Sequence, residues 1–363
     1  MKKILSIFIL FLSHNTVCYS QKNSQFVDSI RVKYNIPEIA YAIVSSDSIL
    51  EINALGYKKI NSNLKAALSD RFRLGSITKT VTAYLAAVLV KEGNLKWETK
   101  FFDLYPELKA GSNPNYYNFT LRDFITFRAN MPTWSYGNKT PTQKEIKGTN
   151  PEQRYEFMKW FFAKTSSISE KQDVYGSNPS YVAAGLMLEK ATGKTYETLV
   201  QELGKSLNID FEFGQPNLKD KNQPWGHDEN MIPEKPALNY KLNWLSSAGN
   251  INVSLPDFCK FIQLQLKGLQ GKSKLFTEEE FNYMHFGLPE FSFGWYPELS
   301  KNNEQQYSFH NGNPGTFLTK VYICKATNKA FILFANVQSE KADEGLIVIL
   351  KELETKYGCV PFY

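Results

Sequence analysis

Ser76 and Lys79 are the two residues of this sequence whose types and spacing best suit covalent chemistry. They stand at the start of a long stretch of small and apolar residues that predicts a buried helix. Positions i and i+3 share one face of a helix, so the lysine amine can reach the serine hydroxyl. An amine in an apolar setting loses proton affinity and can accept the proton of an attacking serine. The pair therefore indicates acyl transfer through a serine ester.

The spacing alone is weak evidence, because the sequence contains it twice. Ser62 and Lys65 repeat it within a polar stretch that has no helical pattern and no apolar flank. On its own, such a pattern indicates only a helix start with an exposed lysine. The residues around each pair must distinguish them.

Those residues favour Ser76. The segment from Phe72 to Ala83 resembles the nucleophile segment of class C β-lactamases, DD-peptidases and related esterases, whose pattern is Phe-x-x-Gly-Ser-x-Thr-Lys-x-x-Thr-Ala, and every fixed position matches. The resemblance implies a covalent acyl-enzyme on Ser76, with Lys79 as its proton partner. It also implies a two-lobed transpeptidase-like fold, and a reaction that needs no metal and no organic cofactor.

A second motif of that family, Tyr-x-Asn, is displaced here. When Asn178 is aligned with the family asparagine, which lies in the substrate-binding cleft, Gly176 stands where the tyrosine belongs and Tyr175 precedes it. We predict that a one-residue bulge restores Tyr175 as the proton shuttle. A loop tyrosine that only packs is the alternative. Tyr181 is the other candidate, but it falls on a helical apolar stripe and is expected in the core.

A third motif resembles the family's Lys-Thr-Gly or His-Thr-Gly triplet. It runs from His310 to Gly315, just before a predicted strand. The resemblance implies that His310 and Gly312 line the cleft, where the histidine helps to hold a substrate carboxylate or the proton network. The backbone amides of Asn313 and Ser76 would form the oxyanion hole. The histidine form of the triplet favours a peptidase or esterase over a dedicated β-lactamase.

The elements that position these residues come from both ends of the chain. Residues 39–57 alternate and turn as a hairpin does, and so do residues 319–337. Residues 344–357 show helical spacing that ends at Gly358. We expect an α+β, β-lactamase/transpeptidase-like fold with an antiparallel sheet flanked by helices. Its α/β lobe would comprise residues 24–80 and 236–363, with a mostly helical lobe, residues 81–235, inserted between the halves.

The first residues predict a signal peptide. Lys2 and Lys3 precede an apolar run from Ile4 to Leu12, which is too short to span a bilayer. We expect residues 1–20 to be removed and residues 21–363 to form a secreted or periplasmic catalytic domain. A lipid anchor on Cys18 is the less favoured alternative, because the residues before it lack the usual small side chain. No later stretch predicts a transmembrane segment.

Composition narrows the possible partners. The formal net charge is +6, but the basic residues are interspersed with acids, which argues against nucleic-acid binding. His227 and His285 have no second ligand at metal spacing, so no metal site is expected. The odd set Cys259, Cys324 and Cys359 leaves two possibilities open: a disulfide between Cys324 and Cys359, or free buried thiols.

Several functions remain compatible with the sequence. The first is hydrolysis of amide or ester bonds in a small-molecule or peptide substrate, with cell-wall fragments among the candidates, by a D-amino-acid peptidase, an esterase or a promiscuous β-lactamase. The others are a penicillin-binding-like protein that is acylated but scarcely turns over, and a catalytically silent homologue with a binding role.

Overall fold

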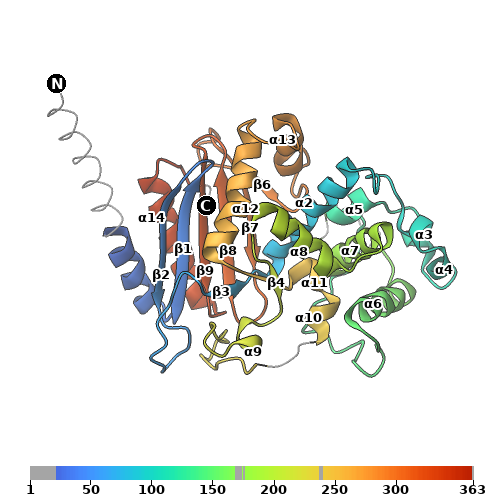
Figure 1. The fold of residues 1–363 in the computed structure, drawn as a ribbon, viewed down its shortest axis with the longest axis horizontal. Coiled ribbons are helices and arrows are strands. Elements are labelled where there is room, and N and C mark those ends of the chain that lie inside the picture. The colour runs from blue at the N-terminus through green and yellow to red at the C-terminus, as the bar shows by residue number, and fades with distance from the viewer. Residues whose placement is uncertain (1–21, 168–173, 175, 237–239, 362–363) are drawn as a thin grey trace.

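The computed structural model describes residues 22–167, 174, 176–236 and 240–361, so the predicted signal peptide and Tyr175 lie outside the described residues. A six-stranded antiparallel sheet has the order β2-β1-β9-β8-β7-β6 (Figure 1). Its strands are β1 (Glu38–Ser45), β2 (Ile49–Gly56), β6 (Tyr296–Leu299), β7 (Gln306–Gly312), β8 (Leu318–Cys324) and β9 (Lys329–Ala335). Both predicted hairpins are confirmed, as β1–β2 and β8–β9.

The sheet is buried on both faces, which explains why β1 is almost continuously apolar. Successive side chains of a strand point to opposite faces. Ile39, Tyr41 and Ile43 join a core with the helix of residues 22–33 and with α14 (Glu340–Lys356). Their neighbours in β1 join a second core with α2 (Thr78–Lys91), α12 (Leu255–Leu269) and α13 (Glu278–Phe286). The predicted antiparallel sheet flanked by helices is therefore confirmed.

The predicted C-terminal helix is confirmed as α14, but it begins at Glu340 rather than Glu344. The helical spacing of apolar residues in the sequence showed only the buried face of the helix and therefore placed its start too late. The first turn is fixed instead by Ser339, whose hydroxyl accepts a hydrogen bond from the Ala342 amide at 3.1 Å. Acidic residues at Glu340 and Asp343 suit the positive end of the helix dipole.

The middle of the chain forms a largely helical part, and most of its helices lie on the right of Figure 1. Its helices are α3 (Phe101–Leu104), α4 (Pro106–Lys109), α5 (Leu121–Ile125), α6 (Asn150–Lys164), α7 (Asn178–Thr192), α8 (Tyr196–Leu207), α9 (Pro216–Lys219), α10 (Tyr240–Trp244) and α11 (Ser246–Gly249). A small sheet of order β3-β5-β4 lies beside it, made of β3 (Arg71–Arg73), β4 (Glu212–Phe213) and β5 (Ile251–Ser254).

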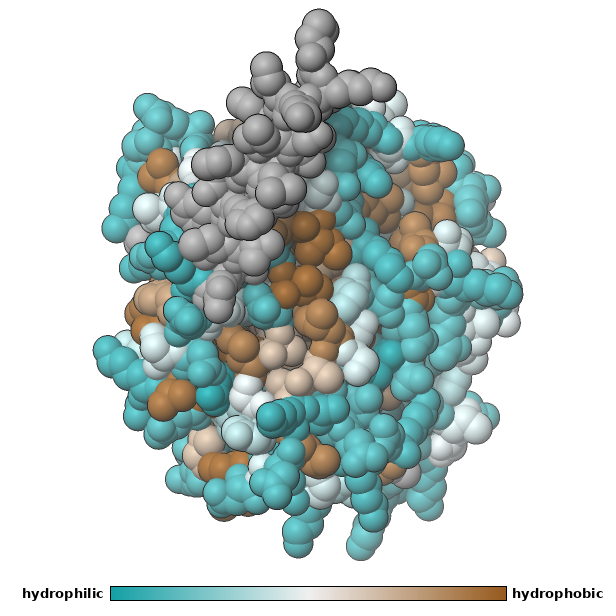
Figure 2. All heavy atoms as spheres, turned by 60° about the vertical axis from the view of Figure 1, so that its left-hand side comes forward, coloured by the Kyte–Doolittle hydropathy of each residue, from teal (hydrophilic) through white to brown (hydrophobic). Residues whose placement is uncertain are grey.

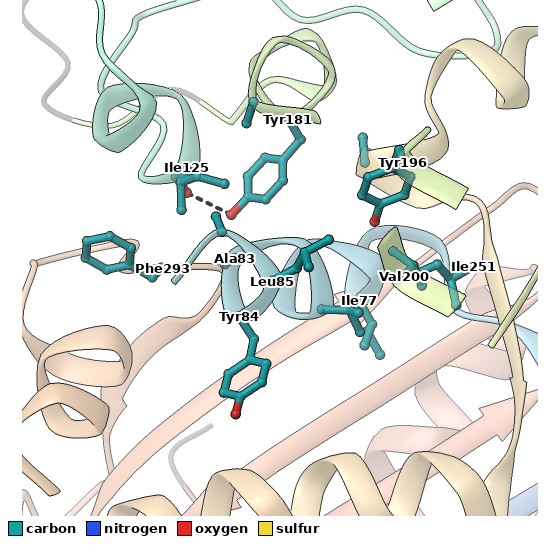
Figure 3. Close-up of a cluster of buried hydrophobic side chains, with 14 of the residues drawn as sticks. Ile77, Ala83, Tyr84, Leu85, Ile125, Tyr181, Tyr196, Val200, Ile251 and Phe293 are labelled. Carbon is teal, nitrogen blue, oxygen red and sulfur yellow. Dashed lines mark hydrogen bonds between the residues drawn. The ribbon is translucent and has the colours of Figure 1, made fainter. Parts of the chain in front are cut away.

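Helix α2 runs between the helical part and the large sheet. Its side chains are buried on nearly every side, and Figure 3 shows Ala83, Tyr84 and Leu85 among residues from α7, α8 and β5. A helix that is apolar all round belongs in a protein core. The helix that carries Lys79 is thus held by both parts of the molecule.

The left side of the molecule in Figure 1 is formed around the edge strand β2. Figure 2 turns this side forward: hydrophilic residues cover most of it, and a band of apolar residues crosses its middle. On β2 itself, Ile49 and Leu50 are exposed. Within the described residues, no helix combines the length and the apolar character that a bilayer span requires.

Candidate functional site

Ser76 lies in a single 3₁₀ turn, Gly75–Ile77, directly before α2. Gly75 makes this turn with a φ of 52°, a conformation that L side chains rarely adopt. A Cβ atom on Gly75 would lie 2.7 Å from the backbone nitrogen of Asn313. The turn that presents Ser76 is therefore in close contact with the Asn313 amide.

Lys79 is buried one turn later and makes three hydrogen bonds. Its Nζ donates to Ser76 Oγ at 3.0 Å, to Asn178 Oδ1 at 2.9 Å and to the carbonyl oxygen of Ala248 at 2.8 Å. Burial lowers the pKa of Lys79 to about 7. Near neutral pH the amine is therefore uncharged in a large fraction of molecules. Asn178 and Ala248 can then hold its two N–H groups while its lone pair faces the serine hydroxyl.

Asn178 is oriented by a second contact. It is the first residue of α7, and its Nδ2 donates to the carbonyl oxygen of Trp134 at 3.0 Å. This bond fixes the amide group with Oδ1 toward Lys79. Helix α7 and the loop at Trp134 together set the position of the lysine amine.

The end of β7 brings Gly312 and Asn313 to the nucleophile turn. A Cβ atom on Gly312 would lie 2.0 Å from the carbonyl oxygen of Leu74, so only glycine fits here. Thr319, opposite Gly312 on β8, donates its hydroxyl hydrogen to the same Leu74 oxygen at 2.9 Å. This close approach gives the β7–β8 end a fixed position beside Ser76.

His310 is buried on β7 as a neutral ring. Its Nδ1 lies 2.9 Å from the carbonyl oxygen of Asn311, and because a carbonyl can only accept, Nδ1 carries the hydrogen. Burial, and then the charge of Lys79, lower the pKa of His310 to about 3. Its Nε2 is buried and has no hydrogen-bond partner among the described residues. The ring thus offers an acceptor, whereas holding a substrate carboxylate, one of the two roles that the resemblance implied, needs a donor or a positive charge.

A cavity of about 300 Å³ brings most of the predicted site residues together. Ser76, Lys79, Gly176, Asn178 and His310 are among the residues that line it. A second pocket, of about 640 Å³, reaches the other side of Ser76. It is lined by Gly312, Asn313 and the first turn of α14.

The two tyrosine candidates have different outcomes. Tyr175 lies outside the described residues. Tyr181 belongs to the core, as predicted. It is fully buried, and its hydroxyl donates to the carbonyl oxygen of Ile125 at 2.7 Å (Figure 3).

The second serine–lysine pair stays apart from this site. Ser62 lies in a turn rather than at a helix start, and its hydroxyl donates to the carbonyl oxygen of Lys59 at 2.8 Å. It lines neither of the two pockets that contain Ser76.

Sequence reasoning missed three residues of the site. Ala248 contributes only a backbone carbonyl, which no residue type reveals. Trp134 orients Asn178 through its own carbonyl and lines the cavity. Tyr296 also lines the cavity. Within the described residues, no three His, Cys, Asp or Glu side chains are grouped as metal ligands.

Known proteins resemble this chain in sequence and in fold. The chain is 20% identical over 317 residues to "Protein flp" of Staphylococcus aureus (strain COL), a match that covers 85% of this chain and 61% of that protein. The chain therefore spans about three fifths of the length of this curated relative.

Three solved structures share the fold. A penicillin-binding protein homologue from Pyrococcus abyssi, described as octameric, has a TM-score of 0.75 at 18% identity, covering 94% of this chain and 78% of its own. SurE with D-Leu has a TM-score of 0.73 at 18% identity, with 95% and 77% covered. A class C β-lactamase mutant has a TM-score of 0.72 at 17% identity, with 92% and 98% covered.

The family model described as Beta-lactamase matches residues 23–353, which is most of the chain. The serine–lysine pair and the sheet that packs against it both lie inside this match. The chain belongs to the beta-lactamase family.

Proposed function

We propose that this protein is a serine hydrolase that cleaves amide or ester bonds through a covalent ester on Ser76. One observation carries the proposal: the buried Lys79 amine lies 3.0 Å from Ser76 Oγ. The apolar surroundings that lower the pKa of Lys79 give it the proton affinity of a base working at neutral pH.

The reaction would proceed in two acyl transfers. As Ser76 Oγ attacks the substrate carbonyl carbon, its proton passes to the uncharged Lys79, and the carbonyl oxygen becomes an oxyanion. The amides of Ser76 and Asn313 would donate hydrogen bonds to that oxyanion. The leaving group takes that proton from Lys79 as it departs, and an ester remains on Ser76. Water then attacks the ester and gives a proton to Lys79, which passes it to Ser76 Oγ as the acid product leaves.

The cavity favours particular substrates. Among its described lining residues, Lys79 is the sole basic side chain, and it is engaged with Ser76. The neutral His310 offers an acceptor to a substrate N–H or O–H group. These features support neutral esters and amides, including small peptides, over substrates with a carboxylate at this wall. An esterase or peptidase therefore fits the site better than a dedicated β-lactamase.

A binding protein without turnover is the second candidate. Gly176 lines the cavity at the position where the family carries its tyrosine. A protein that lacks the proton shuttle could be acylated and fail to release the product.

We also propose that the protein acts outside the cytoplasm. The support is Lys2 and Lys3 followed by a short apolar run. Mass spectrometry of the N-terminus of the exported protein tests this directly: a chain that retains its first residues would contradict removal of residues 1–20.

The decisive experiment records intact masses after exposure to a serine-reactive phosphonate and to a penicillin. We expect one phosphonate adduct on the wild type and none on Ser76→Ala. Ser62→Ala is the matched control, because it removes the other serine of a Ser-x-x-Lys pair, and it should label as the wild type does.

The outcomes separate the candidates. Turnover of a neutral ester by the wild type and not by Ser76→Ala would support the hydrolase. A penicillin adduct that persists would favour the penicillin-binding alternative. Failure of both reagents to label Ser76 would reject the proposed nucleophile and favour a silent homologue.

A further inference from the structure

Two buried thiols lie together on the face of the sheet that α14 covers. Cys324 is the last residue of β8, and Cys359 follows the end of α14. Both are buried in the core between the sheet and α14. The site cavity borders the other core, on the opposite side of the sheet. The catalytic proposal uses neither of them.

The side chains of Gln305 and Thr327 each contact both the Cys324 segment and the Cys359 segment. Gln305 Oε1 accepts hydrogen bonds from Cys324 Sγ at 3.4 Å and from the backbone amide of Val360 at 2.8 Å. Thr327 Oγ1 lies 2.9 Å from Cys359 Sγ and 3.5 Å from the carbonyl oxygen of Cys324. The interaction between the two thiol groups lowers the pKa of Cys324 and raises that of Cys359. Thr327 therefore joins the residues around the two thiols, which lie near each other within one core.

The backbone holds Cys359 in this position. Gly358 ends α14 with a φ of 77°, and the Cys359 amide donates back to the carbonyl oxygen of Glu354 at 2.8 Å, as in a Schellman cap. Lys329, the first residue of β9, donates to the carbonyl oxygen of Tyr357 at 2.7 Å. The helix end is thus tied to the strand that follows Cys324.

We propose that Cys324 and Cys359 form a disulfide bond that joins the end of β8 to the end of α14. Two S–H bonds break and one S–S bond forms. The two electrons and two protons pass to the disulfide of a thiol–disulfide oxidoreductase, which becomes a dithiol. Such bonds persist in oxidising compartments, where we propose that the protein acts. The bond itself does not depend on the chemistry of Ser76.

The pairing leaves Cys259 as the unpaired thiol among Cys259, Cys324 and Cys359. The interaction with Cys359 lowers the pKa of Cys324, so Cys324 is the readier thiolate to attack a disulfide. Cys259 lies on α12 in the other core, and burial raises its pKa to about 12. Cys259 is therefore left as an unreactive thiol and serves as an internal control.

The test counts thiols. The full protein is equilibrated with reduced and oxidised glutathione, denatured in N-ethylmaleimide, and its intact mass is recorded before and after reduction. Of Cys259, Cys324 and Cys359, we expect only Cys259 to be labelled before reduction and all three afterwards. Cys18, where retained, can be assigned separately by peptide mapping. Labelling of all three without reduction would reject the bond, as would glutathione adducts that persist on Cys324 or Cys359.

A stability measurement separates the bond from simple packing. The wild type should melt roughly 5 °C higher when oxidised than when reduced, because the bond restricts the unfolded chain. Cys259→Ala should keep this difference, whereas Cys324→Ala and Cys359→Ala should each lose it. If either of those two variants kept the difference, the oxidation effect would belong to another site. Phosphonate labelling of Ser76 in the same samples reports on the proposed function separately.

Discussion

At the scale of single residues, the properties of the site follow from what surrounds Lys79. Its three hydrogen-bond acceptors come from the turn before α2, from α7 and from α11. None of these partners carries a negative charge in its ordinary state, so nothing compensates the loss of solvation, and the pKa of Lys79 falls. The same burial keeps His310 neutral. The result is an amine of lowered pKa beside the serine and a hydrogen-bond acceptor on His310 in the same cavity.

The first residue-scale prediction concerns pH. If uncharged Lys79 accepts the proton of Ser76, phosphonylation should slow about tenfold per pH unit below pH 7 and level off above it, because the reactive form is lost as the amine is protonated. Lys79→Arg should lose at least about 100-fold in rate, since arginine stays protonated. Mass spectrometry of samples quenched at successive times measures the rate for each protein and pH. A rate that stays flat between pH 5.5 and 8.5 would contradict Lys79 as the base.

The second prediction concerns His310. Replacing the neutral ring by a cation in His310→Lys should raise kcat/KM for a carboxylate-bearing ester relative to its neutral methyl ester by about tenfold, because an ion pair becomes available. His310→Gln is the matched neutral control and should leave this ratio unchanged. If the wild type already had a higher kcat/KM for the carboxylate-bearing ester than for the methyl ester, the argument that His310 is a neutral acceptor would be refuted.

At the scale of elements, the end of β7 and the nucleophile turn depend on each other. Gly312 has no room for a Cβ atom because the Leu74 carbonyl oxygen lies in its place. The Thr319 hydroxyl ties β8 to that same oxygen. The strand can therefore approach Ser76 only if residue 312 has no side chain, and the Asn313 amide comes with it.

Gly312→Ala should push the end of β7 away from Ser76. We expect a loss of about 100-fold or more in acylation rate, since the Asn313 amide would leave the oxyanion position, and a loss of about 1–3 kcal/mol in stability. Gly111→Ala is the control, because a Cβ atom there meets no other atom within 4 Å. Urea unfolding and phosphonate labelling measure the two effects. Equal behaviour of the two variants would show that the contact is unimportant.

At the scale of the whole molecule, the sequence predicted what is local and could not predict what is distant. The hairpins and α14 follow from alternation and helical spacing, and Ser76 meets Lys79 because i and i+3 share a face. The contacts from Lys79 to Asn178 and to Ala248 span 99 and 169 positions in the chain. The resemblance pointed to Asn178, but a backbone carbonyl has no sequence signature. The state of His310 likewise depends on the Asn311 carbonyl and on burial, which only the folded chain supplies.

Burial of uncharged histidines also shapes the stability of the whole protein. His227, His285 and His310 are the described histidines, and burial lowers the pKa of each. His285 joins three elements: Nδ1 lies 2.7 Å from Ser308 Oγ on β7, and Nε2 lies 3.1 Å from Gln265 Oε1 on α12. Its ring stacks on Trp295 at 4.7 Å. A second proton on this ring would place a positive charge in the core and would turn the Ser308 hydroxyl from donor to acceptor.

Stability should therefore fall as the pH drops below 6.5. The pKa of His285 is about 3 in the folded protein and near 6.5 when unfolded, so between these values the unfolded chain binds the extra proton. Each such histidine lowers the free energy of unfolding by about 1.4 kcal/mol per pH unit. Glu38, whose pKa is raised by burial, acts in the opposite direction.

The test is urea unfolding of the wild type and of His285→Gln at pH 7.5, 6.5, 5.5 and 4.5. Because both proteins contain Glu38 and the other titrating groups, the difference between their free energies of unfolding reports on His285 alone. We expect His285→Gln to be less stable at pH 7.5 and to lose stability less steeply below 6.5, because it keeps one titrating group fewer. If the free energies of unfolding of the two proteins fell in parallel with pH, His285 would already be positively charged in the folded protein.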